Sequence, residues 1–403
     1  MSAEPATHQP PPGPIVTSEW SQSLADGAPG IALPHIERAR TGITGWESVH
    51  RLAMAMTAEP VHADPEVTNL FRGAPAVAYA LHTAGHPGYR TALATLDQHI
   101  TRIIQIRLDA AHQRIDQQRI AQAGEYDLIN GLTGFGAYLM HRHHDPDDLL
   151  RAVLEYLVRL TRPVRVHGRM LPGWWATGSP DRRRSPRWNG GHTGFGMAHG
   201  IAGPLALLST AMRQGTIVDG HREAIATIGG WLDRWQQGQA QHAWWPEVID
   251  YAELRADAPS STGPERPSWC YGTPGIARAQ QLAAAAAGDP ERARLAEQAL
   301  LGCLTDERQL AHLADAGLCH GWAGLVHTAR RAATDIAASA EELATATGTA
   351  AGRMREHVRK HGAPTDGGFL EGAAGVALVE EARYDVAAVS TAGPTWDTCL
   401  LLS

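Results

Sequence analysis

The sequence of 403 residues has few cysteines, no long apolar run and no excess of positive charge. Four cysteines in so long a chain do not form a disulfide framework, so metal binding or catalysis is the first question to ask of them. No run of about 18 apolar residues occurs, so we expect no membrane span. The formal net charge of -7 gives no reason to expect a nucleic-acid partner. We therefore expect a cytoplasmic protein that meets a membrane only through partner proteins.

The first 18 residues are rich in proline and polar residues and lack the basic start and apolar core of a signal peptide. We expect a disordered tail there, followed by one domain over residues 19–403. The one dense basic cluster runs from Arg182 to Arg187. It is either a solvated loop or a docking site for an acidic leader peptide.

One glycine-containing pattern recurs seven times along the chain. Its first glycines are Gly27, Gly73, Gly131, Gly200, Gly272, Gly321 and Gly372. Each copy precedes a small and apolar segment that predicts a helix, and gaps of 46, 58, 69, 72, 49 and 51 residues leave room for a second helix. Seven such units predict an all-α protein, an α/α toroid with small-residue helices inside and amphipathic helices outside. An open solenoid of the same units is the structural alternative.

The second helices have start signals and apolar stripes of their own. Asp145-Pro146 and Asp289-Pro290 each place a capping residue before a proline suited to the first helical position. One apolar stripe follows at helical spacing: Leu150, Val153, Leu154 and Leu157. Residues 89–122, 221–240 and 339–361 are also predicted helices. The longer third and fourth gaps predict inserted loops near 165–195 and 241–266, which contain Trp174, Trp175, Trp244 and Trp245.

The residue before each first glycine is polar in all seven copies: Asp26, Arg72, Asn130, His199, Tyr271, His320 and Glu371. These positions should line one end of the ring together. One step earlier stand five apolar residues and two cysteines, Cys270 and Cys319. With His320 they form a Cys2His set of the kind that holds one zinc ion and leaves a fourth position open. Taken singly, each cysteine could instead be a small buried hydrophobic residue.

A zinc ion with two thiolate ligands favours alkylation of a bound thiol over hydrolysis by bound water. Addition of a thiolate to a carbon-carbon double bond conjugated to a carbonyl produces an enolate, which needs an acid. His199 is the predicted acid, with Tyr271 as the alternative. Asp127 could orient that imidazole or cap its own helix, and Arg266 could stabilise the enolate or lie in a surface loop.

Three segments resemble the lanthionine synthetase C-like cyclases of lanthipeptide biosynthesis. They are Ser268-Trp269-Cys270-Tyr271-Gly272 with Pro274-Gly275, then Leu318-Cys319-His320-Gly321, and Ala198-His199-Gly200-Ile201 with Gly203-Pro204. Weaker matches are Tyr126-Asp127 before Gly131-Leu132 and the terminal Trp396 with Cys399-Leu400-Leu401. The resemblance covers nearly the whole chain. The double-aromatic insertions and Ala76, in place of the second glycine of its copy, depart from the usual pattern and affect the expected peptide-docking surface.

The resemblance implies an α/α toroid with zinc held by Cys270, Cys319 and His320. It also implies that His199 protonates the enolate with help from Asp127 and Arg266. The implied substrate is a ribosomal precursor peptide, leader and core, whose Ser and Thr have been dehydrated by a separate dehydratase. The implied products are lanthionine and methyllanthionine rings, made by a stand-alone cyclase that could join a dehydratase and an exporter in one complex.

Two other functions remain open at this point. Zinc-dependent prenyl transfer to a thiol also uses a helical toroid, although a carboxylate normally joins the Cys and His ligands there. A non-catalytic protein that binds a peptide or glutathione is the other alternative, since the family includes such members. The presence of His199, Asp127 and Arg266 favours an enzyme over a binding protein.

Overall fold

The computed structural model describes residues 21–142, 148–166, 168–180, 183, 185–335, 340–382 and 395–403. The tail expected over residues 1–18 and the helix start expected at Asp145 lie outside the described residues. So do Arg182 and Arg184 of the basic cluster.

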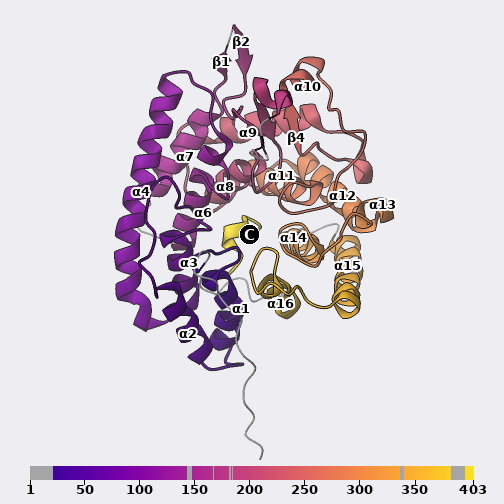
Figure 1. Ribbon diagram of the computed structural model, residues 1–403. Helices are drawn as coiled ribbons and strands as arrows, with labels where there is room; N and C mark the ends of the chain where they lie inside the picture. Colours follow the sequence, from indigo (N-terminus) through magenta and orange to yellow (C-terminus); the bar gives the residue numbers. More distant parts are fainter. Residues whose placement is uncertain are drawn as a thin grey trace, which may run out of the picture.

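Seven helices follow the seven glycine turns and form the inner ring. They are α1 (Ala28–Arg40), α3 (Ala74–Ala84), α6 (Leu132–Arg142), α8 (Ala202–Arg213), α11 (Thr273–Ala287), α14 (Trp322–Thr334) and α16 (Ala373–Glu381). Each contacts the next, and α16 contacts α1, so the ring is closed (Figure 1). The predicted α/α toroid is confirmed, and the open solenoid is wrong.

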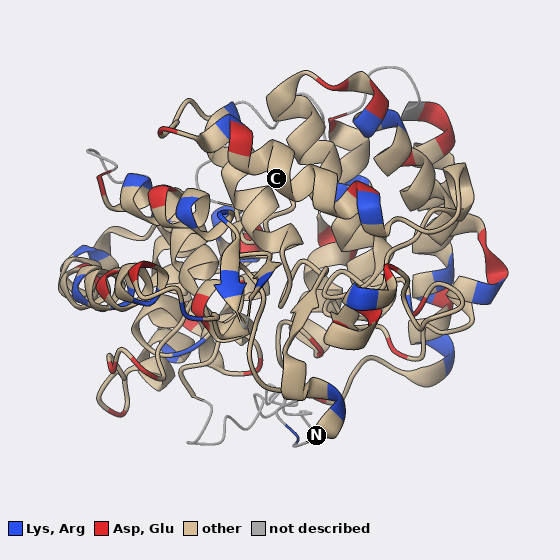
Figure 2. Ribbon diagram, turned by 90° about the horizontal axis from the view of Figure 1, so that it is seen from above, with Lys and Arg blue, Asp and Glu red and all other residues tan. Residues whose placement is uncertain are grey.

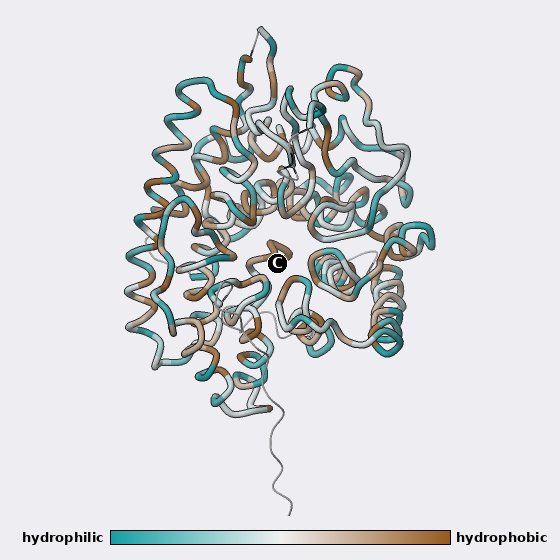
Figure 3. The backbone as a smooth tube through the Cα atoms, viewed as in Figure 1, coloured by the Kyte–Doolittle hydropathy of each residue, from teal (hydrophilic) through white to brown (hydrophobic). Residues whose placement is uncertain are grey.

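The outer helices pack against their inner partners one by one. Those of the described residues are α2 (Glu47–Met56), α4 (Arg90–Asp116), α7 (Asp148–Leu160), α9 (His221–Trp235), α12 (Pro290–Thr305) and α15 (Ala340–His361). The predicted stripe of α7 is confirmed, because Leu150, Val153, Leu154 and Leu157 are all buried. Hydrophilic and hydrophobic stretches alternate along α4 in Figure 3. Such helices bury one stripe against the inner ring and leave the other face to solvent.

Two predicted helices end earlier than expected. Residues 89–122 contain α4, which stops at Asp116 because Gln118 adopts a left-handed backbone conformation with φ of 53°. The helix expected over 221–240 stops at Trp235, where Gln236 is already extended. The start of α12 is as predicted, since the Asp289 side chain accepts a 3.0 Å hydrogen bond from Arg292 N.

Short strands and short helices lie in the two expected insertions, between other long helices and near the end of the chain. The strands are β1 (Val164–Val166), β2 (Arg169–Leu171), β3 (His192–Gly194) and β4 (Val248–Asp250). The short helices are η2 (Pro87–Tyr89), α5 (Ala123–Tyr126), η3 (Pro186–Gly190), η4 (Ala240–His242), α10 (Tyr251–Ala256), α13 (Glu307–Leu310) and η5 (Thr398–Leu400). Strand β3 pairs antiparallel with β4, with His192 opposite Asp250, so one insertion is joined to the other. Their paired tryptophans are all buried: Trp174, Trp175, Trp244 and Trp245.

The second glycine of the repeat allows the turn to fold back over the start of its helix. A Cβ atom on Gly275 would lie 2.1 Å from the Trp269 carbonyl oxygen, and one on Gly324 would lie 2.1 Å from that of Leu318. Such contacts are far inside van der Waals distance, so a side chain would push the turn away. The residues before each first glycine therefore stay close to the inner helices.

Backbone hydrogen bonds link most of the seven turns around one rim of the ring. They run from Leu24 N to Phe71 O, Leu128 N to Ala198 O, Ala198 N to Cys270 O, Cys270 N to Cys319 O, Cys319 N to Leu370 O and Leu370 N to Ala25 O. The bond between Cys270 and Cys319 measures 3.2 Å from N to O. Consecutive turns thus present equivalent residues side by side.

The chain ends at the centre of the ring (Figure 1). The Tyr79 hydroxyl donates to the Trp396 carbonyl at 3.0 Å, and Arg278 Nε donates to the Leu402 carbonyl at 2.9 Å. Seen from above, acidic and basic residues are interspersed over the ring (Figure 2). Among the described residues, no helix is long and apolar enough to cross a membrane.

Candidate functional site

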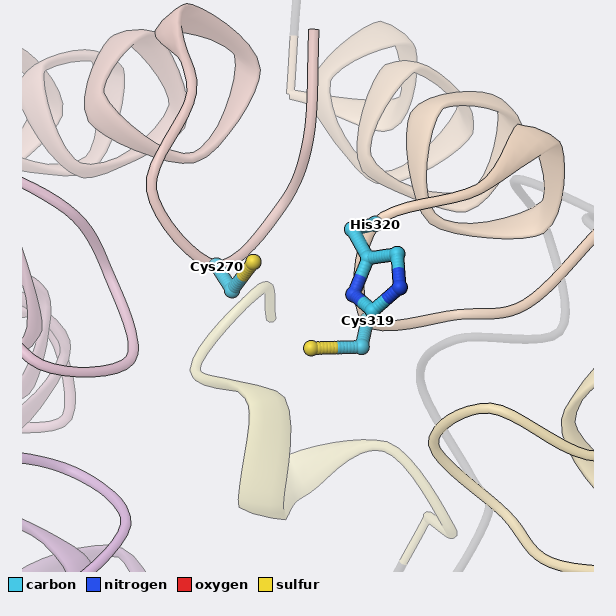
Figure 4. A group of neighbouring side chains, drawn as sticks. All are labelled: Cys270, Cys319 and His320. Atoms are coloured by element: carbon cyan, nitrogen blue, oxygen red, sulfur yellow. The ribbon is translucent and has the colours of Figure 1, made fainter. Parts of the chain in front are cut away.

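Cys270, Cys319 and His320 meet at the rim where two consecutive turns are hydrogen-bonded. Cys270 comes from the turn before α11, and the other two come from the turn before α14 (Figure 4). One ligand atom from each of the three lies within 4.8 Å of the others. Two thiols and one imidazole at this spacing fit zinc, for which Cys2His with an open fourth position is an established donor set. The three residues that were predicted as ligands are therefore brought together and could hold a metal ion.

The electrostatics of the cluster favour a thiolate at Cys270. Hydrogen bonding from the Cys319 thiol lowers the pKa of Cys270 well below its ordinary value, against the effect of burial, and His320 adds to the lowering. The pKa of Cys319 is raised instead, because it lies beside the Cys270 sulfur. The hydrogen bond with Cys270 raises the pKa of His320. A thiolate at Cys270 is thus favoured, and a bound cation would favour loss of the Cys319 proton as well.

Ser268 is a neighbour of the cluster that the sequence did not single out as a site residue. Its Oγ lies 3.6 Å from Cys270 Sγ and accepts backbone hydrogen bonds from Tyr271 N at 3.3 Å and Gly272 N at 3.0 Å. Because those two donors occupy its lone pairs, the hydroxyl hydrogen is available to the sulfur once Cys270 is ionised. Ser268 thereby connects the candidate ligand Cys270 to the start of α11.

Carboxylates flank the imidazole of His320. Asp315 Oδ2 lies 3.6 Å from Nε2, and Glu371 Oε1 lies 3.8 Å from Nδ1. A histidine that ligates a metal through one ring nitrogen commonly directs the other to a carboxylate, which fixes the ring. Here a carboxylate is near whichever nitrogen is not used.

His199 and Asp127 form a second polar pair in the turns before α8 and α6. His199 Nδ1 lies 2.7 Å from Asp127 Oδ2, and Asp127 is almost completely buried. The carboxylate also accepts from Asn130 N at 2.6 Å and Gly131 N at 3.0 Å, so it is held in place by the turn. Because Nδ1 is bonded to this carboxylate, Nε2 is the ring nitrogen that could act on a substrate.

One cleft of about 1100 Å³ contains His199, Asp127 and Tyr271 in its wall. The rings of His199 and Tyr271 lie 5.7 Å apart between centroids. Burial raises the pKa of Tyr271, so its phenol stays protonated at neutral pH. Tyr271 directly follows Cys270 in the chain, so one residue of the cleft wall is the sequence neighbour of a residue of the thiol cluster.

Arg266 and Glu247 interact electrostatically with the cluster. The Arg266 charge is among the influences on the pKa values of Cys319 and His320, in both cases lowering them against larger opposing effects. Glu247, from the second insertion, was missed by the sequence analysis. Burial raises its pKa to about 7, and the neighbouring Cys270 adds to the rise. Only the fold brings this carboxyl to the site, and no motif marked it.

The remaining cysteines and the basic cluster lie elsewhere. Cys303 and Cys399 are fully buried, and burial raises the pKa of both thiols, consistent with a packing role. Arg187 pairs with Asp250 at 2.8 Å and with Glu253 at 3.2 Å. Its charge therefore fastens the first insertion to α10, which leaves less positive charge for a leader peptide than the sequence suggested.

The ring and its cluster define a closed α/α toroid with a candidate metal centre at one rim. The profile of the lanthionine synthetase C-like proteins matches residues 18–386. The chain belongs to this family.

Known proteins similar to the chain include one curated relative and one solved structure. The nisin biosynthesis protein NisC of Lactococcus lactis subsp. lactis is 24% identical over 204 residues, which cover 50% of this chain and 48% of that protein. The match thus spans about half the length of this curated relative. The solved structure of a nisin cyclase matches with a TM-score of 0.76 and 18% identity, over 96% of this chain and 93% of that chain. This second likeness establishes the shared fold.

Proposed function

We propose that this protein is a zinc-dependent peptide cyclase that adds cysteine thiols to dehydroalanine or dehydrobutyrine and so forms lanthionine and methyllanthionine rings. The observation that carries the proposal is the pairing of two features at one rim. The Cys270, Cys319 and His320 donor atoms lie within 4.8 Å of one another, and the His199–Asp127 pair opens on the cleft that Tyr271 shares. The family and the similarity to NisC support the same conclusion.

The proposed ligands are Cys270, Cys319 and His320, with one zinc ion per chain. Zinc bound there would lower the pKa of a substrate thiol and keep its sulfur nucleophilic. Ser268 would help to orient Cys270, and the carboxylates of Asp315 and Glu371 would help to orient His320. The protein's own contribution is thus a fixed and partly buried donor set with room beside it for a peptide.

His199 is the proposed proton donor for the second half of the reaction. As the thiolate sulfur bonds to the β-carbon, the double-bond electrons move onto the α-carbon and its carbonyl. His199, charged and held through Nδ1 by the Asp127 carboxylate, gives its Nε2 proton to the α-carbon. The proton lost by the thiol balances the one gained by the carbon, so the peptide keeps its mass.

Arg266 and Tyr271 are proposed to assist at the carbonyl. The Arg266 charge acts close to the thiol cluster, where it would stabilise negative charge on the enolate oxygen. Tyr271 keeps its phenol proton because burial raises its pKa, so it is a hydrogen-bond donor beside His199. It is also the alternative acid if His199 is not required.

The proposed substrate is a ribosomal precursor peptide with a leader and a dehydrated core. A separate dehydratase must act first, because the reaction consumes dehydrated residues. We propose that this enzyme works in the cytoplasm and that a dehydratase and an exporter join it in a complex.

The decisive experiment incubates zinc-loaded protein with a dehydrated, cysteine-containing peptide. Cyclisation should remove the free thiol, measured by an alkylating reagent, without a change in peptide mass. The Cys319→Ala protein is the matched control, because it should lose zinc and activity while its helical circular dichroism stays unchanged. Binding without thiol loss would identify a non-catalytic peptide-binding protein.

A second arm adds a prenyl diphosphate to the same mixture. A gain in peptide mass at the cysteine would identify thiol prenyl transfer and refute the cyclase. The composition of the cluster argues against that outcome, since among the described residues no carboxylate joins its three donors.

A further inference from the structure

The catalytic cleft continues into a second cleft on the next part of the rim. The first has a volume of about 1100 Å³ and contains His199 and Tyr271 in its wall. The second has a volume of about 800 Å³ and lies between the turns of the first two repeats and helix α4. Gln122, Gly124 and Asn130 line both, so the two clefts meet there.

The junction between the two clefts is held by hydrogen bonds and leaves an open passage. Asn130 O accepts from Arg107 Nη1 at 2.5 Å, and Asn130 Nδ2 donates to Asp127 Oδ2 at 3.3 Å. Gly124 presents no side chain, and a Cβ atom built on it would meet only the Asn130 Cβ, at an ordinary 3.5 Å. The floor is therefore held by hydrogen bonds, and the space above Gly124 is open.

Charged residues of both signs line the second cleft: Arg72, Arg107, Arg114 and Arg119, with Asp26, Glu66 and Glu125. Arg107 donates to the carbonyl oxygens of Pro65 and Thr68 besides that of Asn130, and Arg114 is paired with Glu125 at 2.7 Å. Arg119 is exposed in the same wall. Within the described part of the chain, its guanidinium makes none of the hydrogen bonds or ion pairs of the structure. An anionic group that enters this cleft would meet Arg119 without displacing another partner.

We propose that the two clefts form one peptide-binding groove, an inference that rests on the cyclase function above. The dehydrated residue and the cysteine react in the first cleft. A flanking segment of the same peptide crosses over Gly124 into the second cleft, where an acidic side chain pairs with Arg119. Ligand sites commonly have volumes of roughly 300–1,000 Å³, so each cleft is large enough for a segment of several residues.

The test uses synthetic peptides and measures binding separately from turnover. The short probe contains dehydroalanine, two glycines and serine in place of the cysteine, so it cannot react. Extended probes add six residues at either end, with two glutamates or two glutamines among glycines. Fluorescence anisotropy on zinc-loaded protein gives the dissociation constant of each. The wild-type protein should bind one glutamate-extended probe more tightly than its glutamine counterpart, and added salt should reduce the difference.

Two variants and two matched controls test where the extended probe binds. Arg119→Gln should abolish the preference for glutamate, a change of about twofold to fivefold for one exposed ion pair. Arg102→Gln is the matched control and should keep it, because Arg102 is an exposed arginine of α4 that lines neither cleft. Gly124→Trp should remove most of the affinity gained by extension, whereas Gly124→Ala should retain it.

The groove is refuted if extension at either end gains nothing, if Arg119→Gln keeps the glutamate preference, or if Gly124→Trp keeps the gain. Turnover of the cysteine form of the short probe is measured in parallel. Failure of the wild-type protein to cyclise any dehydrated peptide would refute the proposed function. Cyclisation without any gain from extension would refute only the groove.

Discussion

The indole Nε1 of Trp269 donates a hydrogen bond of 3.1 Å to the carbonyl oxygen of Leu400. Trp269 directly precedes the candidate ligand Cys270, and Leu400 lies in the last turn of the chain, at the centre of the ring. The two residues are 131 positions apart. The chain end therefore supports the turn that contains the candidate ligand from the inside.

Replacing Trp269 by Phe should lower both stability and zinc affinity. The smaller ring keeps most of the packing but loses the hydrogen bond, which is worth about 1 kcal/mol in the free energy of unfolding. Urea denaturation measures the loss of stability, and competition with a zinc chelator measures the loss of zinc affinity. Trp175→Phe is the control, since its indole donates to Gly190 O at 3.0 Å in the first insertion. An equal loss of zinc affinity in both variants would contradict the supporting role of Leu400.

Replacing Ser268 by Ala should weaken zinc binding by about 10-fold to 100-fold, as removal of a group that hydrogen-bonds a metal ligand commonly does. The reason is the hydroxyl 3.6 Å from Cys270 Sγ, which stabilises the thiolate. Ser209→Ala is the matched control, because that buried hydroxyl bonds only to Leu205 O, at 2.6 Å, within α8. Competition with a zinc chelator measures the zinc affinity of both proteins. Equal affinities would show that Ser268 stabilises only the backbone of its turn.

Replacing Asp127 by Asn should retain zinc and slow ring closure. An amide in place of the carboxylate cannot stabilise a charged His199, whose Nδ1 lies 2.7 Å away. His199→Ala should also retain zinc and lose about 100-fold to 10000-fold in rate, the usual contribution of a general acid. The double variant should be little slower than His199→Ala, because the two residues act as one unit. If His199→Ala loses its zinc, His199 is a ligand. If it cyclises peptide at the original rate with clean stereochemistry, the acid is elsewhere, with Tyr271 the first alternative.

Replacing Asp397 by Asn should cost about 3–5 kcal/mol of stability at pH 7, the usual cost of breaking a buried ion pair. Asp397 is fully buried and bonds to Arg331 Nε at 2.6 Å and His327 Nε2 at 2.8 Å. Burial alone would raise the pKa of Asp397, but Arg331 and His327 hold it far below its ordinary range.

The sign of the pH dependence follows from that lowered pKa. The stabilisation is complete above the unfolded-state value of about 3.9 and is lost as the pH falls further toward the folded-state value. The difference between the wild-type and Asp397→Asn proteins should therefore be constant from pH 7 to about pH 5 and shrink below about pH 4. Urea denaturation across this range measures it, and a difference that grows on acidification would contradict the assignment.

The repeats and the candidate ligands were visible in the sequence because each depends on local spacing. A glycine turn followed by a helix of small residues requires only neighbouring residues, so seven inner helices could be predicted. The equivalence of Cys270 and Cys319 follows from counting back from the same glycine. Helix ends were less predictable, since α4 stops at a backbone conformation of Gln118 that no residue preference indicates.

Closure of the ring and the contacts across it were decided by the tertiary structure. The contact of α16 with α1, the pairing of His199 with Asp127 and the approach of Glu247 to the cluster all join residues distant in sequence. No spacing rule covers such contacts, because they depend on the accumulated rotation of successive helix pairs. The sequence by itself determined which residues each turn presents. Only the packing of the turns around one rim, fixed by backbone hydrogen bonds between them, decided which of those residues face one another.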